Sequence, residues 1–298
     1  RTILALSDDR ASNSGQARGL ADAVAARTGA QVQAIQLPRR APLADALTAW
    51  TGLAPGPLTR LPKAALAIGA GRVGTLAAAY AGRDGAKTIA ILRPPLPGLQ
   101  FDLIVAPEHD QFFRPNAVST LGGLHGLTDA RIAEAAAILP DLPQPLAAIL
   151  IGGPSGTATF DKAAEARLMA DLTALRATDH HLYATTSRRT PKPLIGRLRD
   201  AFPDMTLYTG EGPNPYPGLL GRADVIAVTS DSISMISEAL FTGRPVIVTG
   251  AEQTSPKHAR FHASIADRLS SAASPYTAPE PLREAERIAD MIVTRGLV

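Results

Sequence analysis

Short apolar runs alternate with amphipathic segments along most of the chain. The apolar runs predict buried strands, and the amphipathic segments predict the helices between them. The runs are rich in Val, Ile, Leu and Ala, and this favours parallel strands that helices cover on both faces. The predicted strands are Thr2–Leu6, Gln31–Leu37, Ala65–Ile68, Thr88–Leu92, Leu103–Ala106, Ala147–Ile151, His181–Thr185, Thr206–Tyr208, Val225–Val228 and Pro245–Val248. The predicted helices are Gln16–Ala26, Val73–Tyr80, Lys162–Ala177, Lys192–Phe202, Tyr216–Gly221 and Ser232–Thr242.

This alternation starts twice, on either side of a proline-rich stretch from Leu139 to Pro145. Proline continues neither a helix nor a central strand, so the stretch predicts a linker. We therefore predict an α/β protein with two Rossmann-like domains, residues 1–140 and 146–278, whose parallel sheets face each other across a cleft. Residues 281–298 are predicted to form a helix that packs back on the first domain.

A polar segment from Thr229 to Glu238 directly follows one predicted strand of the second domain. Ligands of open parallel sheets bind at the carboxyl ends of strands, and a helix start there offers amide donors to a phosphate. If the helix begins near Asp231, then Asp231 and Glu238 share a face, and Glu238 is placed to bind a ribose. The alternative is that the start is only an N-cap and that Glu238 is solvated. The candidate phosphate ligands here are Thr229, Ser230, Asp231, Ser232 and Ser234.

Three other strand ends of the second domain carry candidate binding residues. Gly153 and Ser155 belong to a glycine-rich turn that suits an anion, although a plain tight turn explains it equally and the P-loop pattern is missing. The next end has five basic residues and no acidic one between Thr185 and Arg199, which favours phosphate contacts over a merely solvated basic face. Its candidates are Thr186, Ser187, Arg188 and Arg189. A third end, either a base-binding loop or a simple connection, contributes Glu211, Asn214 and Tyr216.

Candidates for acid–base chemistry follow strands of the first domain. Asp8 ends the opening strand and His109 ends another, so either is a candidate general base, with a structural role as the alternative. His258 and His262 have the spacing of zinc ligands on a helix but lack the intervening glutamate, so no metal site is predicted.

Composition narrows the class of protein without identifying it. The 298 residues contain no cysteine, which excludes disulfides and thiolate chemistry and is compatible with a cytoplasmic setting. A net charge of +3 and 4% aromatic residues give little support for nucleic-acid binding. No apolar run is long enough to span a membrane, and the basic stretch near Arg188 allows at most a peripheral contact with anionic lipid.

Several of these motifs, taken in order, resemble the mitochondrial fission ELM-type family. The runs are Ile68–Arg72, Phe101–Asp110, Ile151–Ser155, Thr185–Pro191, Asn214–Tyr216 and Thr229–Glu238. The family is similar to GT-B glycosyltransferases, which agrees with the two-domain prediction. One departure is the opening loop, where Asp9 and Ser12 stand in place of expected glycines, and this argues against close backbone approach of an acceptor at that loop.

The resemblance implies a metal-independent transferase that moves a sugar from a nucleoside diphosphate to an unknown acceptor, with no separate cofactor. Two alternatives stay open. One is a non-catalytic scaffold with a protein partner, as the plant member's role in fission implies, because fold does not determine function. The other is a sugar-nucleotide epimerase of the same architecture, for which the sequence offers no evident acid/base set.

Overall fold

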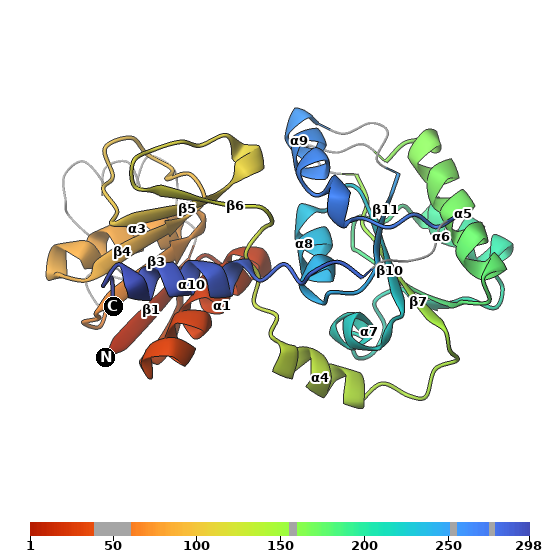
Figure 1. The fold of residues 1–298 in the computed structure, drawn as a ribbon, viewed down its shortest axis with the longest axis horizontal. Coiled ribbons are helices and arrows are strands. Elements are labelled where there is room, and N and C mark those ends of the chain that lie inside the picture. The colour runs from red at the N-terminus through yellow and green to blue at the C-terminus, as the bar shows by residue number, and fades with distance from the viewer. Residues whose placement is uncertain (39–60, 155–159, 251–254, 274–277) are drawn as a thin grey trace. The chain divides into compact units, whose positions relative to one another are not determined.

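The computed structural model describes residues 1–38, 61–154, 160–250, 255–273 and 278–298 (Figure 1). The chain divides into two compact units, one formed by residues 1–126 and 283–298 and the other by residues 127–282. Each unit is an α/β structure around one parallel sheet, as the sequence predicts.

The first unit contains a six-stranded sheet in the order β2-β1-β3-β4-β5-β6, and every neighbouring pair is parallel. Its strands are β1 (Thr2–Ser7), β2 (Gln31–Gln36), β3 (Leu66–Ala70), β4 (Lys87–Ile91), β5 (Leu103–Pro107) and β6 (Ala117–Thr120). Its helices are α1 (Ala11–Thr28), α3 (Gly71–Ala81) and α10 (Glu284–Thr294), with short 3-10 turns η2 (Gly82–Asp84) and η3 (Glu108–Asp110).

Alternate residues of these strands enter two apolar layers, as the period of a strand requires. Ile3 and Ile68 pack with α1 and α10 on one face of the sheet. Leu4 and Ala67 pack with α3 on the other. The central strand β3 is buried at all five positions, which explains why its sequence is a continuous apolar run.

The second unit contains a five-stranded parallel sheet in the order β11-β10-β7-β8-β9. Its strands are β7 (Leu146–Ile151), β8 (His181–Thr186), β9 (Thr206–Tyr208), β10 (Val225–Thr229) and β11 (Val246–Thr249). Its helices are α4 (Asp129–Ala137), α5 (Lys162–Ala177), α6 (Lys192–Ala201), α7 (Tyr216–Arg222), α8 (Ile233–Phe241) and α9 (Pro256–Ser264), followed by the turn η4 (Ala266–Arg268). The central strands β7 and β10 lie side by side, so their carboxyl ends share one edge.

The boundary between the units lies near Gly126, whereas the sequence analysis placed it at residue 140. The reason is α4, which packs on α7: a Cβ on Gly218 would come within 2.6 Å of the Ala135 carbonyl, so only a glycine allows this approach. The last helix, α10, contributes Ile288 and Ile292 to the apolar layer around α1. The final segment therefore belongs to the first unit.

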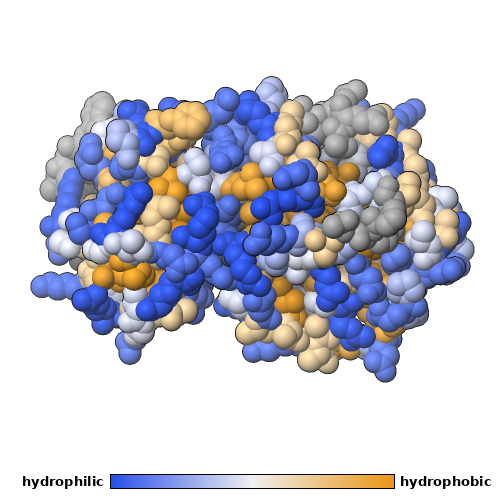
Figure 2. All heavy atoms as spheres, in the orientation of Figure 1, coloured by the Kyte–Doolittle hydropathy of each residue, from blue (hydrophilic) through white to orange (hydrophobic). Residues whose placement is uncertain are grey.

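Polar side chains cover most of the face in Figure 2, and apolar ones are scattered among them. Among the helices in the described ranges, none is both long and apolar enough to span a bilayer.

Candidate functional site

The polar segment after β10 is a turn followed by a helix, and the helix begins two residues after Asp231, where the sequence pattern predicted its start. Helix α8 starts at Ile233, and Ser232 is its N-cap, whose hydroxyl accepts from the Met235 amide at 3.3 Å. Asp231 precedes the helix, so the prediction that it shares a helical face with Glu238 is wrong. Ser234 is exposed and Glu238 is half-buried, so Glu238 is not the solvated residue of the alternative interpretation.

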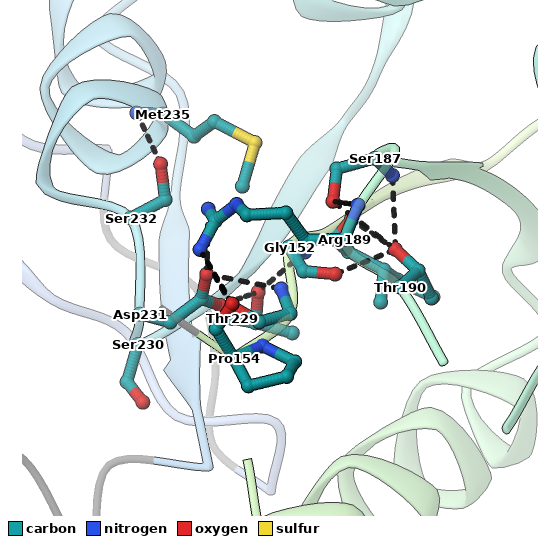
Figure 3. Close-up of polar contacts among 12 residues, drawn as sticks. Gly152, Pro154, Ser187, Arg189, Thr190, Thr229, Ser230, Asp231, Ser232 and Met235 are labelled. Carbon is teal, nitrogen blue, oxygen red and sulfur yellow. Dashed lines mark hydrogen bonds and ion pairs between the residues drawn. The ribbon is translucent and has the colours of Figure 1, made fainter. Parts of the chain in front are cut away.

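The Asp231 carboxylate is buried and joins three strand ends (Figure 3). Its Oδ1 accepts from the Thr229 hydroxyl at 2.6 Å, and its Oδ2 accepts from the Gly153 amide at 3.0 Å. The Arg189 guanidinium donates to the same Oδ2 at 3.1 Å and balances the charge. A buried carboxylate is stable only with such partners. Asp231 therefore holds together the ends of β7, β8 and β10.

The glycine-rich turn after β7 meets this carboxylate with its backbone. The Gly152 amide donates to the Thr229 hydroxyl at 2.8 Å, and a Cβ on Gly152 would lie 2.2 Å from Asp231 Oδ2. A Cβ on Gly153 would lie 2.2 Å from the Arg189 carbonyl. These contacts give a packing reason for both glycines, and the Gly153 amide is already used by a side chain of the protein. Ser155, the other candidate in this turn, lies outside the described residues.

The loop after β8 is tied back to β7 by hydroxyl groups. The Thr190 hydroxyl accepts from the Ser187 amide at 2.9 Å and lies 2.5 Å from the Gly152 carbonyl. The Ser187 hydroxyl accepts from the Arg189 amide at 3.1 Å. These bonds use groups that the sequence analysis assigned to phosphate, and they give the loop one fixed conformation. Thr186 donates to the Tyr208 carbonyl at 3.2 Å on β9.

The two adjacent arginines of this loop differ in their surroundings. Arg189 donates to the Gly153 carbonyl at 2.7 Å as well as to Asp231, so its guanidinium is bound to the cluster although the side chain is partly exposed. Arg188 is exposed, and within the described part of the chain its side chain has no hydrogen bond or ion pair. Arg188 is thus the cation of this pair that an incoming anion meets without competition.

Glu238 and Tyr216 form a pair between α8 and α7. The Tyr216 hydroxyl donates to Glu238 Oε2. Burial raises the pKa of Glu238, which the hydrogen bond from Tyr216 partly opposes. Burial and the neighbouring Glu238 carboxylate raise the pKa of Tyr216 well above its ordinary value, so the phenol stays a donor. Asn214 accepts from the Tyr216 amide at 3.1 Å, while Glu211 and Asn214 are both exposed.

Helix α9 supports the turn after β10 through two histidines, a role that the sequence analysis missed. Nε2 of His258 lies 3.2 Å from the Asp231 carbonyl, and Nε2 of His262 lies 3.1 Å from the Ser230 carbonyl. Since carbonyls only accept, both Nε2 atoms carry the proton. Burial lowers the pKa of both rings. Lys257 lowers the pKa of His258 further, and His258 does the same to His262. The N-cap signal Ser255-Pro256 was the available clue to this helix.

Among the described residues, no group of three or more His, Cys, Asp or Glu side chains is arranged to hold a metal ion.

The two candidate bases lie in the first unit. Asp8 is buried, and its Oδ1 accepts from the Arg10 amide at 3.1 Å and from the Asn13 side-chain amide at 2.8 Å. This arrangement fixes the turn from β1 into α1. His109 lies in η3, directly after β5, and is 4% exposed.

Known proteins match most of this chain in sequence or in fold. A family model described as "Mitochondrial fission ELM1" matches residues 11–295. The Mitochondrial fission protein ELM1 of Arabidopsis thaliana is 32% identical over 200 residues, which cover 57% of this chain and 47% of the plant protein. The matched region is thus about half of that relative's length.

Two solved structures resemble the chain in fold. A putative UDP-N-acetylglucosamine 2-epimerase from Listeria monocytogenes aligns with a TM-score of 0.53 and 11% identity over 99% of this chain and 96% of its own. A UDP-GlcNAc 2-epimerase from Neisseria meningitidis, bound to UDP-GlcNAc, aligns with a TM-score of 0.52 and 12% identity over 99% of this chain and 100% of its own. At these identities the likeness establishes the fold alone, and it confirms the predicted GT-B-like α/β class.

Proposed function

Because this chain belongs to the mitochondrial fission ELM1 family and has a GT-B-like fold, we propose that its second unit binds a nucleoside diphosphate sugar and that the protein transfers the sugar to an acceptor. The observation that carries this proposal is the difference between two arginines at the end of β8. Arg189 is paired with Asp231, whereas Arg188 is exposed and has no ion pair among the described residues.

Arg188 would contact the diphosphate. A guanidinium binds phosphate through paired, charge-assisted hydrogen bonds, and its charge stabilises the diphosphate as a leaving group. The first turn of α8, after the Ser232 cap, adds amide donors and the positive end of the helix dipole.

Glu238 would bind the ribose. Its Oε2 is taken by the Tyr216 hydroxyl, which leaves Oε1 to accept from a ribose hydroxyl. Burial raises the pKa of Glu238, and the Tyr216 hydrogen bond fixes its orientation in advance. Asp8 or His109 of the first unit would take the proton of the acceptor.

Calorimetric titration of the full chain with uridine, guanosine, adenosine, cytidine and thymidine diphosphates tests the donor site. Arg188→Ala is expected to weaken the best ligand about tenfold, the size of one charge-assisted hydrogen bond. Arg199→Ala, which removes the same charge from an exposed position late in α6, is the matched control and is expected to change affinity less than about twofold. A wild-type protein that binds none of the five diphosphates contradicts the proposal.

The ribose contact has its own readout. Wild-type protein is expected to bind the ribonucleoside diphosphate more tightly than its 2′-deoxy form, and Glu238→Gln is expected to reduce that preference. An unchanged preference in Glu238→Gln contradicts the ribose role while leaving the Arg188 result intact.

Binding without turnover is the second candidate function. It is favoured by the burial of both candidate bases, since Asp8 and His109 are each 4% exposed and a general base must reach its proton. Nuclear magnetic resonance of the sugar nucleotide that binds best separates the possibilities. Release of nucleoside diphosphate with an acceptor present supports transfer, and deuterium uptake from solvent indicates epimerisation. If neither change is observed, the result supports a binding protein.

A further inference from the structure

Two connections of the first unit lack the helix that normally links parallel strands. The segment from Leu92 to Asp102 joins β4 to β5, and the segment from Gln111 to Asn116 follows η3 and leads into β6. Both return over the face of the sheet that α3 covers, where Leu99 and Phe112 pack against its apolar layer. A groove of about 630 Å³ lies between these two segments, within the size range of small-molecule sites.

The groove is positively charged. Arg93 contributes from the first segment and Arg114 from the second, and none of the described residues that line the groove is acidic. Both arginines are exposed, and within the described ranges neither has a hydrogen bond from its guanidinium or an ion pair. The Arg114 guanidinium lies 6.0 Å from the centre of the Phe112 ring, which limits where it points. Two arginines on separate segments, both able to form hydrogen bonds, suit a tetrahedral oxyanion.

Apolar side chains form the rest of the wall. Leu96, Leu99 and Phe112 line the groove beside the arginines, and Phe113, the next residue, is 76% exposed. A bare inorganic ion would leave this apolar wall in water, whereas an ester with an organic substituent would cover it.

Backbone conformation at the start of each segment fixes how that segment leaves the sheet. Leu92 has a φ of 70° and Gln111 a φ of 50°, both in the left-handed region that side chains disfavour. Leu92 directly precedes Arg93, and Gln111 directly precedes Phe112. The Gln111 amide donates to the Glu108 carbonyl at 2.9 Å and the Leu92 amide to the Val105 carbonyl at 2.8 Å, so each segment leaves the sheet in a fixed direction.

We propose that this groove binds a phosphate ester, with the phosphate on Arg93 and Arg114 and the organic substituent against Leu96, Leu99 and Phe112. The site is built wholly from the first unit, so it does not depend on the donor site proposed above. The ester could reach it as a soluble metabolite or as a lipid headgroup, because the recognised chemistry is the same.

Calorimetric titration with phenyl phosphate, and flotation with phosphatidylglycerol vesicles against phosphatidylcholine vesicles, test the two sources. Arg93→Ala and Arg114→Ala are each expected to weaken binding about tenfold in at least one of these two assays. Arg295→Ala, an exposed arginine just after α10 on the opposite face of the same sheet, is the matched control and is expected to retain wild-type binding. Phenyl phosphate binding that is lost in Arg188→Ala instead of in Arg93→Ala and Arg114→Ala belongs to the donor site and contradicts the groove.

The outcomes are distinct. Loss of phenyl phosphate binding in the two variants supports the groove with a soluble ester, and loss of vesicle binding alone supports it with a lipid headgroup. The proposal is overturned if wild-type protein binds neither probe, or if Arg295→Ala loses as much affinity as Arg93→Ala. Circular dichroism spectra that match wild type show that the exposed substitutions have left the fold intact.

Discussion

Each unit has a buried aspartate at the carboxyl end of a strand, and the two are held in different ways. Asp8 follows β1 and is 4% exposed, while Asp231 follows β10 and is 5% exposed. Asp8 accepts from a peptide amide and the Asn13 side chain, two neutral donors. Asp231 accepts from the Thr229 hydroxyl, the Gly153 amide and the Arg189 guanidinium.

The sequence separations explain what each aspartate stabilises. Asn13 is 5 residues from Asp8, so that bond shapes one turn. Gly153 and Arg189 are 78 and 42 residues from Asp231, so those bonds connect separate strands of the sheet. The second unit therefore keeps its strand-end site rigid through one central carboxylate, whereas the first unit fixes its strand end locally.

The largest expected effect comes from adding a methyl group beside Asp231. Gly152→Ala places a Cβ 2.2 Å from Asp231 Oδ2, in a buried cluster that cannot move aside, and it is expected to lower the free energy of unfolding by about 3 kcal/mol. Gly71→Ala beside Asp8 is expected to cost about 2 kcal/mol, because its φ is +70° and because the Asn13 side chain, its nearest neighbour, must turn away and give up its hydrogen bond to Asp8.

Urea denaturation followed by circular dichroism measures both changes. Gly196→Ala is the control, since Gly196 lies inside α6 and no atom of the described residues is within 4 Å of where its Cβ would be. Alanine there is expected to be neutral or to stabilise by about 1 kcal/mol. If Gly152→Ala is no more harmful than Gly71→Ala, the Asp231 cluster is not the rigid centre described above.

Removing the cation beside Asp231 tests whether the two aspartates are held in different ways. Arg189→Ala leaves the buried Asp231 carboxylate without its cation and is expected to cost about 2 kcal/mol, less than for a fully buried pair because the Arg189 side chain is 42% exposed. Asn13→Ala beside Asp8 removes one neutral hydrogen bond and is expected to cost about 1 kcal/mol.

A double-mutant cycle of Arg189→Ala with Asp231→Asn isolates the coupling. The double variant is expected to be more stable than the sum of the single effects by about 1 kcal/mol, because residues in one ion-pair network do not act independently. Additive effects would mean that the guanidinium does not stabilise the carboxylate.

The smallest expected effect is a dependence on pH through α9. Burial lowers the pKa of His258 and His262 below the ordinary value of 6.5, so the unfolded chain takes up protons first as the pH falls. The contribution of these two histidines to the free energy of unfolding is therefore expected to be constant above a pH of about 6.5. It is expected to decrease as the pH falls from about 6.5 towards the folded-state pKa.

His262→Gln removes one of these groups and keeps a side-chain amide that is able to donate to the Ser230 carbonyl. We expect this variant to lose less stability than wild type between neutral and mildly acidic pH in thermal denaturation. His181→Gln, at the amino end of β8, is the control and is expected to follow wild type. Parallel pH curves for His262→Gln and wild type would contradict the buried-histidine account.

Much of the architecture follows from local patterns in the chain. Every predicted strand is observed within two residues of its expected bounds. The strands β3, β7 and β10 are buried at every position and read as apolar runs, whereas the edge strand β2 is mostly exposed. The strand β6 was missed because Ala117–Thr120 contains a single large apolar residue, and its pairing with β5 is what makes it a strand. Helix α4 was missed although Thr128 is a recognisable N-cap for it.

Local patterns in the chain are enough to show that polar residues and glycines follow the strands β1, β7, β8 and β10. Which of those residues contact one another depends on how the strands pair. Arg188 and Arg189 are neighbours with the same chemistry, yet only Arg189 reaches Asp231. That choice depends on the parallel register that aligns β7 with β8 and β10, which brings together residues 42 and 78 positions apart, and no local pattern encodes such a distance.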